Sequence, residues 1–99
     1  MIGIYKIHNT SNNKVYVGQS IHIEQRFIEH RNALKYNRHC NLHLQSAWNK
    51  YGSASFVFEV LEECPQSELN ARETFWKLHF DPNTYNLGHT NFEGTTSEE

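Results

Sequence analysis

The chain has little of what marks secreted or membrane proteins. Its 99 residues include only two cysteines and two prolines. No apolar run reaches the length of a bilayer span, and the N-terminus lacks the basic and apolar segments of a signal peptide. Cys40 and Cys64 fit a reducing compartment, although their number also allows one disulfide. We therefore expect an intracellular, cytoplasmic protein with no membrane partner.

Length and composition predict one packed domain. Hydrophobic residues make up 37% of the chain and aromatic residues 13%, which suits a chain long enough for one core but not for two. No internal repeat is visible. The last seven residues carry no apolar side chain and are acidic. We expect a domain over residues 1–90 and an acidic flexible tail or linker stub over residues 91–99.

Charge is distributed unevenly. The net charge of -2 argues by itself against binding to nucleic acid. Residues 1–52, however, contain seven basic residues against two acidic ones, whereas residues 53–99 contain two against nine. A polyanion would be attracted to the first half. An ordinary solvated basic face is equally compatible with this pattern.

The N-terminal stretch has the pattern of a β-hairpin. Two short apolar and aromatic runs within residues 2–17 flank a polar Asn-Thr-Ser-Asn-Asn segment. If paired residue numbers sum to 21, Tyr5 lies opposite Tyr16 and Gly3 lies opposite Gly18. Strand side chains alternate between faces, so both tyrosines should project from one face, beside the two glycines. Tyrosine and glycine are also common in hairpins that have no chemical function.

Helical periodicity and strand propensity account for the rest of the chain. Ser20 can cap a helix over residues 21–36, and a second helix over residues 42–51 should end at a glycine. Residues 55–61 are rich in aromatic and β-branched residues and predict a third strand. A third helix is expected over residues 68–80.

Polar residues interrupt the apolar faces of the first and third helices. Arg26 and His30 are one turn apart and flank the stripe formed by Ile23, Phe27 and Leu34. Glu73 lies on the same side of its helix as Leu69. A buried carboxylate needs a partner, and Arg26 or a metal ion would serve. An arginine at a core margin can simply extend to solvent, and a core histidine is usually structural.

These residues occur together in a known family. The sequence resembles the GIY-YIG nuclease domain, and most of all the catalytic domains of phage-type homing endonucleases. The resemblance covers residues 2–88. It rests on Gly3-Ile4-Tyr5, Tyr16-Val17-Gly18, Arg26-x-x-x-His30, Asn49-Lys-Tyr-Gly52, Arg72-Glu73 and Tyr85-Asn86.

The resemblance implies a fold, a reaction and partners. The fold is of the α+β class, with a small three-stranded antiparallel sheet, made of the N-terminal hairpin and a third strand, flanked by about three helices. The reaction is metal-dependent hydrolysis of a DNA phosphodiester to a 5′-phosphate and a 3′-hydroxyl. Double-stranded DNA is the expected partner. A homodimer, or an additional DNA-binding domain outside this chain, is open.

The resemblance also implies roles for individual residues. Glu73 is the ligand of one Mg²⁺ or Mn²⁺ ion, which prefers oxygen donors. Arg26 contacts the phosphate. Tyr5 is the general base, and its phenol must be activated because its ordinary pKa is near 10. The candidate activators are His30, Tyr16 and Lys14. The supporting residues are Gly3, Gly18, His39, which aligns with a family histidine, and Asn86, expected to brace the site.

Two other functions fit parts of the sequence. His39, Cys40, His43 and Cys64 could form a zinc module, although their spacing lacks a CxxC pair. A non-catalytic DNA-binding module could keep the same scaffold without turnover. The second alternative does not explain the semi-buried carboxylate of Glu73.

Overall fold

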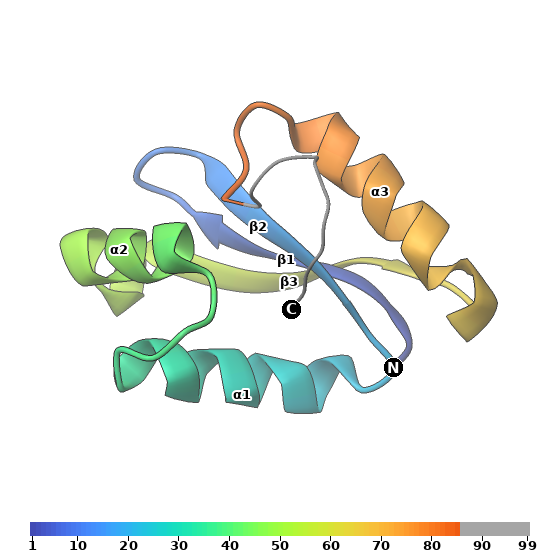
Figure 1. Cartoon of the computed structure of the whole chain (residues 1–99), viewed down its shortest axis with the longest axis horizontal. Coiled ribbons are helices and arrows are strands. Elements are labelled where there is room, and N and C mark those ends of the chain that lie inside the picture. Colours follow the sequence, from blue (N-terminus) through green and yellow to red (C-terminus); the bar gives the residue numbers. More distant parts are fainter. Residues whose placement is uncertain (86–99) are drawn as a thin grey trace.

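A three-stranded antiparallel sheet forms the centre of the molecule. The computed structural model describes residues 1–85 (Figure 1). Strands β1 (Gly3–Asn9), β2 (Lys14–Ser20) and β3 (Phe56–Glu63) lie in the order β2-β1-β3. The central strand β1 has hydrogen-bonded neighbours on both sides, and its apolar and aromatic residues are buried. The predicted α+β fold, built from an N-terminal hairpin and a third strand, is confirmed.

Three helices pack on the sheet. They are α1 (Ile23–Lys35), α2 (Leu42–Tyr51) and α3 (Leu69–Phe80). Short 3₁₀ turns, η1 (Ser53–Ser55) and η2 (Gln66–Glu68), precede β3 and α3. The bounds of α2 match the prediction, and Gly52 follows it with a positive φ of 87°.

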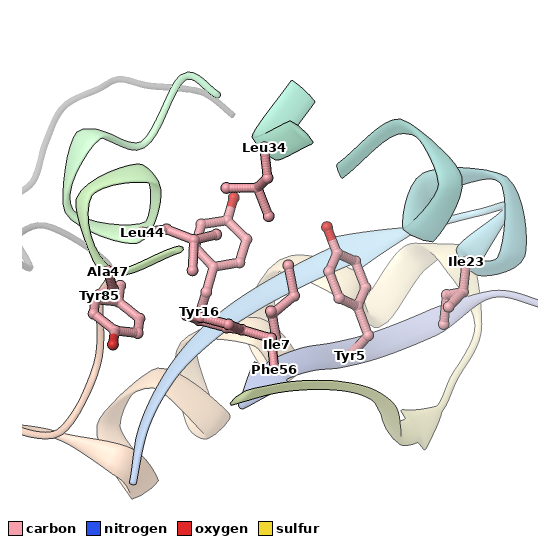
Figure 2. Packing of buried hydrophobic residues seen from close by; sticks show 9 residues of the cluster. All are labelled: Tyr5, Ile7, Tyr16, Ile23, Leu34, Leu44, Ala47, Phe56 and Tyr85. Carbon is pink, nitrogen blue, oxygen red and sulfur yellow. The ribbon is translucent and has the colours of Figure 1, made fainter. Parts of the chain in front are cut away.

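Helices cover both faces of the sheet, because the strands carry apolar residues on both. On one face, Tyr5, Ile7 and Tyr16 pack against α1 and α2 (Figure 2). On the other, Ile4, Val15 and Val17 pack against Leu69, Trp76 and Phe80 of α3. The order of the residues along each strand therefore decides which side chains meet α1 and which meet α3.

The predicted register of the hairpin is wrong by two residues. Tyr5 pairs with Gly18, and Tyr16 pairs with Ile7, instead of the two tyrosines pairing with each other. The reversal occurs after Asn9, and Asn13 closes it with a φ of 62°, a conformation that asparagine tolerates. A shift of two residues leaves every side chain on its face. Both tyrosines therefore still project from one face, as predicted.

Helix α1 begins two residues later than predicted, and Ser20 does not cap it. His22 occupies the cap position and makes no capping hydrogen bond through its side chain. The Ser20 hydroxyl instead accepts a hydrogen bond from the backbone N–H of His22 at 2.9 Å. This turn uses up the capping group before the helix starts.

The segment after α3 returns to the sheet. Thr84 forms a parallel bridge with Val15, and Tyr85 is buried in the cluster between the sheet and α2. Its hydroxyl accepts hydrogen bonds from the side-chain amides of Asn9 at 3.0 Å and Asn12 at 3.2 Å. The segment thereby ties the hairpin turn to the C-terminal part of the domain. The predicted boundary at residue 90 lies outside the described residues.

Two predictions about cellular context can be compared with the structure. Both cysteines are free thiols, so Cys40 and Cys64 do not form a disulfide. Among residues 1–85, no helix is both long and apolar enough to cross a bilayer.

Candidate active site

Tyr5 lies at the centre of the candidate site because β1 is the central strand. Its side chain is 1% exposed and crosses the backbone of Gly18 on β2. A Cβ atom at residue 18 would collide with the Tyr5 hydroxyl. Gly18 therefore provides the space in which the phenol lies, which gives the second glycine of the motif a physical role.

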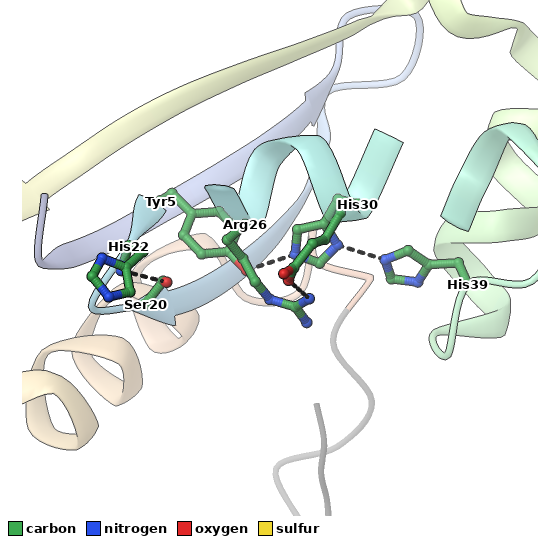
Figure 3. Close-up of polar contacts among 7 residues, drawn as sticks. Tyr5, Ser20, His22, Arg26, His30 and His39 are labelled. Carbon is green, nitrogen blue, oxygen red and sulfur yellow. Dashed lines mark hydrogen bonds and ion pairs between the residues drawn. The ribbon is translucent and has the colours of Figure 1, made fainter. Parts of the chain in front are cut away.

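A chain of buried hydrogen bonds leads away from the Tyr5 hydroxyl (Figure 3). The hydroxyl oxygen is 2.6 Å from His30 Nε2, and His30 Nδ1 is 2.7 Å from His39 Nε2. His39 Nδ1 accepts a hydrogen bond from the backbone N–H of Asn41 at 3.0 Å. His30 on α1 and His39 in the segment between α1 and α2 thus form one polar network with Tyr5 of the sheet.

Burial keeps both histidines neutral. Desolvation, followed by the positive charge of Arg26, lowers the pKa of His30 to about 2. The same two causes lower the pKa of His39 to about 4. Charging either ring inside this cluster would require an imidazolium to lie near a guanidinium without solvent. At neutral pH each ring therefore carries one proton.

Tyr16 lines the same network through its ring. Its edge meets the rings of His30 and His39, with centroid separations of 5.4 and 5.8 Å. The ring is 6% exposed. Burial, and next the neighbouring Tyr5, raise the pKa of Tyr16 above its ordinary value. Tyr16 is therefore a neutral phenol packed against both histidines.

Arg26 lies on α1 one turn before His30, at the margin of the core. Its guanidinium bonds Glu29 at 3.0 Å, and its side chain is 31% exposed. Burial raises the pKa of Tyr5, and the positive charge of Arg26 opposes that rise. Arg26 is thus the cation that acts on the pKa of the Tyr5 phenol, while part of its side chain faces solvent.

Glu73 reaches the site from α3, on the other side of the edge strand β2. Its Oε1 accepts a hydrogen bond from Gln19 Nε2 at 2.5 Å, and its Oε2 pairs with Lys77 Nζ at 3.1 Å. The side chain is 18% exposed. The expectation of a mostly buried, paired carboxylate is confirmed. The proposed partner Arg26 is wrong, because α1 and α3 lie on opposite faces of the sheet.

The donor set limits what kind of metal site this can be. Among residues 1–85, no group of three or more histidine, cysteine, aspartate or glutamate side chains is arranged to hold an ion. Glu73 is therefore a single hard oxygen donor. Such a donor fits Mg²⁺ or Mn²⁺, which keep several waters and take further oxygens from a substrate phosphate. It does not fit an ion that needs a closed protein cage.

The structure does not bring every predicted residue to the site. Lys14 is exposed at the turn end of β2 and pairs with Asn9, four positions along β1 from Tyr5. Its predicted position beside the phenol is wrong. Gly3 lies at the other end of β1, where a Cβ atom would collide with the carbonyl oxygen of Glu62. Gly3 thus serves the pairing of β1 with β3. Asn86 lies outside the described residues.

The zinc module is contradicted by the positions of its four candidate ligands. His39 is bound to His30 on the α1 side of the sheet, whereas Cys64 packs in the cluster on the α3 side. Cys40 and His43 are exposed. Histidines and cysteines that lie on opposite faces of a sheet cannot share one tetrahedral ion.

Sequence reasoning missed four residues that orient the site. Asn41 and Gln45 hold His39, and Gln19 and Lys77 hold Glu73. Lys77 had a signal, because it follows Glu73 by one helical turn. The contacts of the other three depend on tertiary packing or on a backbone N–H group, neither of which has a sequence signature.

Comparisons with known proteins agree on one family. The family model described as the GIY-YIG catalytic domain matches residues 1–86. The chain is 39% identical over 99 residues to intron-associated endonuclease 1 of Enterobacteria phage T4. It is 38% identical over 60 residues to a probable intron-encoded endonuclease 1 of Neurospora crassa.

The comparisons differ in how much of each protein is covered. The phage match includes 96% of this chain but 40% of the phage protein. The Neurospora match includes 61% of this chain and 18% of that protein. The chain therefore spans less than half the length of these two relatives.

Two solved structures share the fold. The catalytic domain of the homing endonuclease I-TevI superposes with a TM-score of 0.83 at 37% identity, covering 89% of this chain and 99% of that one. A glutamate-to-alanine mutant of the I-TevI catalytic domain gives a TM-score of 0.81 at 36% identity, covering 93% of this chain and 98% of that one. The similarity thus extends over nearly the whole of each solved domain.

Proposed function

Because this chain belongs to the GIY-YIG family of catalytic domains, we propose that it is the catalytic domain of a DNA endonuclease. The reaction is hydrolysis of a phosphodiester bond to a 5′-phosphate and a 3′-hydroxyl. The observation that carries the proposal is the placement of Tyr5, bonded to His30, beside Arg26, with the carboxylate of Glu73 across the edge strand β2. In this proposal Tyr5 accepts a proton, Arg26 binds the phosphate and Glu73 binds the metal ion.

The Tyr5 oxygen is the proposed general base. As a phenolate it takes a proton from water, and the resulting hydroxide attacks the phosphorus. Burial raises the pKa of Tyr5, so the phenolate needs positive charge close by. Arg26 supplies part of that charge. Its partly exposed guanidinium also matches two phosphate oxygens and would stabilise the charge that develops there.

Glu73 is the proposed ligand of one Mg²⁺ or Mn²⁺ ion. Divalent-metal dependence is general in the family. When bound, the ion supplies charge neutralisation at the phosphate and at the leaving 3′ oxygen. Gln19 and Lys77 hold the two carboxylate oxygens in place and mask part of the charge until DNA arrives. One site of this kind cuts one strand, so cleavage of both strands requires two copies or two successive cuts.

A plasmid nicking assay with the 99-residue chain tests the proposal. Wild-type protein should convert supercoiled plasmid to the nicked form with Mg²⁺ and not with EDTA. Tyr5→Phe should slow nicking by roughly 10² to 10⁴, the range of general base catalysis. The control is Tyr36→Phe, which removes a hydroxyl from an exposed tyrosine and should leave the rate unchanged.

The same assay distinguishes the alternative function. A non-catalytic DNA-binding module would shift DNA on a gel and leave it intact at every metal concentration. That result would overturn the nuclease proposal. Near-normal nicking by Tyr5→Phe would instead move the base to another group.

A further inference from the structure

His39 is held in a single orientation by contacts on both sides of its ring and its backbone. Its Nδ1 accepts from the backbone N–H of Asn41, and its own backbone N–H donates to Gln45 Oε1, both at 3.0 Å. Gln45 Nε2 in turn donates to the carbonyl of Leu34 at 3.0 Å. His39 and Gln45 are 5% and 6% exposed. The connector between α1 and α2 is thus fixed where it presents the imidazole.

The two histidine rings are joined edge to edge. Their centroids are 4.9 Å apart and their planes differ by 19°. The 2.7 Å between His39 Nε2 and His30 Nδ1 is too short for rings packed face to face, and it is a normal hydrogen-bond distance. The rings therefore lie nearly in one plane and share a single hydrogen.

The backbone N–H of Asn41 sets the direction of this chain, because it can only donate. His39 Nδ1 must therefore carry a lone pair, and a neutral His39 has its proton on Nε2. That proton is donated to His30, so His30 Nδ1 also carries a lone pair. A neutral His30 then has its proton on Nε2, which points at the Tyr5 oxygen. Any other arrangement places two donors or two acceptors face to face.

This arrangement of protons determines the direction of the Tyr5 hydroxyl proton. Its oxygen accepts a hydrogen bond from His30, so its own proton cannot be directed at His30 and must point away from the chain. We propose that His39, oriented by the backbone of Asn41, is a positioning residue that makes His30 donate to the Tyr5 oxygen. The arrangement of protons belongs to the protein alone, whereas its catalytic consequence rests on the proposed nuclease function.

This arrangement excludes a proton relay through the histidines. When the phenolate takes a proton from water, one O–H bond of the water breaks and the O–H bond of Tyr5 forms. His30 keeps its Nε2 proton throughout and bonds the oxygen before and after the transfer. The histidines therefore stabilise the charged form of Tyr5 without exchanging protons with it. The proton that Tyr5 must lose beforehand goes to solvent water, because the guanidinium of Arg26 has no lone pair that could accept it.

Nitrogen-15 NMR of the histidine rings tests the arrangement directly. In ¹⁵N-histidine-labelled protein without DNA or metal, His30 and His39 should each show a protonated Nε2 and an unprotonated Nδ1 at pH 7. A proton on Nδ1 of either ring would overturn the proposal. Because this measurement needs no activity, it stands whether or not the protein cuts DNA.

A pair of variants tests the consequence. In His39→Gln the amide can still accept from Asn41 and donate to His30, so the His30 proton should stay on Nε2 and nicking should stay within about tenfold of wild type. In His39→Glu the carboxylate can only accept, so the His30 proton should move to Nδ1 and nicking should fall at least about a hundredfold. Thermal melts show whether each variant folds.

The outcomes separate this inference from the nuclease proposal. If His39→Glu folds, moves the His30 proton and still nicks like wild type, the positioning role fails while the nuclease proposal stands. If wild type does not nick with Mg²⁺, the nuclease proposal fails while the NMR result decides the arrangement of protons. Loss of nicking in His39→Gln with the His30 proton still on Nε2 would also contradict the inference.

Discussion

At the scale of single residues, the site depends on groups whose charge is controlled by their neighbours. Burial keeps His30 and His39 neutral and makes Tyr5 a weaker acid than free tyrosine. Glu73 is the contrasting case, because an amide and an ammonium bind its two oxygens. Both carboxylate oxygens are therefore paired with neighbouring side chains, and most of the side chain is buried.

Replacing Glu73 by glutamine tests its role with little change of shape. Glu73→Gln keeps an oxygen that can accept from Gln19 but removes the charge that a metal needs. Nicking should fall at least about a hundredfold, because several kcal/mol of charge stabilisation are lost. DNA binding, measured by gel shift, should stay equal or become tighter. Glu68→Gln, at an exposed site before α3, is the control and should behave as wild type.

If Glu73→Gln nicks at the wild-type rate over a range of Mg²⁺ concentrations, Glu73 is not the ligand. A loss of both nicking and DNA binding would indicate misfolding, which a thermal melt of the same sample identifies.

At the scale of elements, the hairpin does more than present two tyrosines. Its register places Gly18, the residue with no side chain, directly under the Tyr5 ring. The asparagine-rich turn sets that register through the backbone hydrogen bond between Asn13 and Asn9. The Tyr85 hydroxyl fixes the turn by accepting a hydrogen bond from the side chain of Asn9. A slip of two residues would keep the faces but place Tyr16 where the glycine is needed.

Gly18→Ala should therefore disturb the site as well as the fold. The added methyl group collides with the Tyr5 hydroxyl, so we expect a loss of about 1–3 kcal/mol in the free energy of unfolding. Nicking should fall about as far as in Tyr5→Phe, because the bond to His30 is displaced. Urea unfolding and the nicking assay measure the two effects.

Gly52→Ala is the matched control. Gly52 has a φ of 87° and no atom near its missing Cβ, so alanine there costs stability through backbone strain alone. It should leave nicking unchanged below its melting temperature. Equal effects of the two substitutions on nicking would show that the close approach at Gly18 has no catalytic role.

At the scale of the whole molecule, the residues of the candidate site come together only when three layers are assembled. The sheet supplies Tyr5 and Tyr16, the α1 side supplies Arg26 and His30, and α3 on the opposite face supplies Glu73. His30 and His39 are therefore buried only in the folded state. They also couple folding to pH, because the unfolded chain exposes them to water.

Stability should fall as the pH is lowered from about 6.5 to 4. In the unfolded chain both histidines titrate near 6.5, whereas in the folded protein the pKa values of His30 and His39 are lowered to about 2 and about 4. Between these values the unfolded state binds more protons, so the free energy of unfolding decreases with decreasing pH. Each histidine contributes at most about 1.4 kcal/mol per pH unit.

Urea unfolding at pH 7, 6 and 5 measures this slope. His39→Gln should make the dependence shallower, because one of the two groups is gone. His43→Gln removes an exposed histidine of α2 and should leave the slope unchanged. A stability that does not change between pH 7 and 5, or an unchanged slope in His39→Gln, would mean that the folded state binds these protons too.

The elements of this protein follow from local sequence. Periodicity and turn residues place the strands and helices to within two residues at most boundaries, because they depend on the spacing of apolar side chains and on nearby backbone groups. The family motif likewise lies in the order of residues, and it predicts site roles for Tyr5, Arg26, His30 and Glu73. The shared face of the two tyrosines needs only the alternation of side chains along each strand and a register that is right to an even number of residues.

Only the tertiary structure decides how those residues are connected. The pairing of Tyr5 with Gly18 depends on which turn closes, and the partners of Glu73 depend on which face α3 covers. The direction of the hydrogen bonds through His39 depends on one backbone N–H, that of Asn41, whose orientation exists only after the connector has packed. Sequence patterns record side chains, whereas these contacts are set by backbone geometry and by residues far apart in the chain.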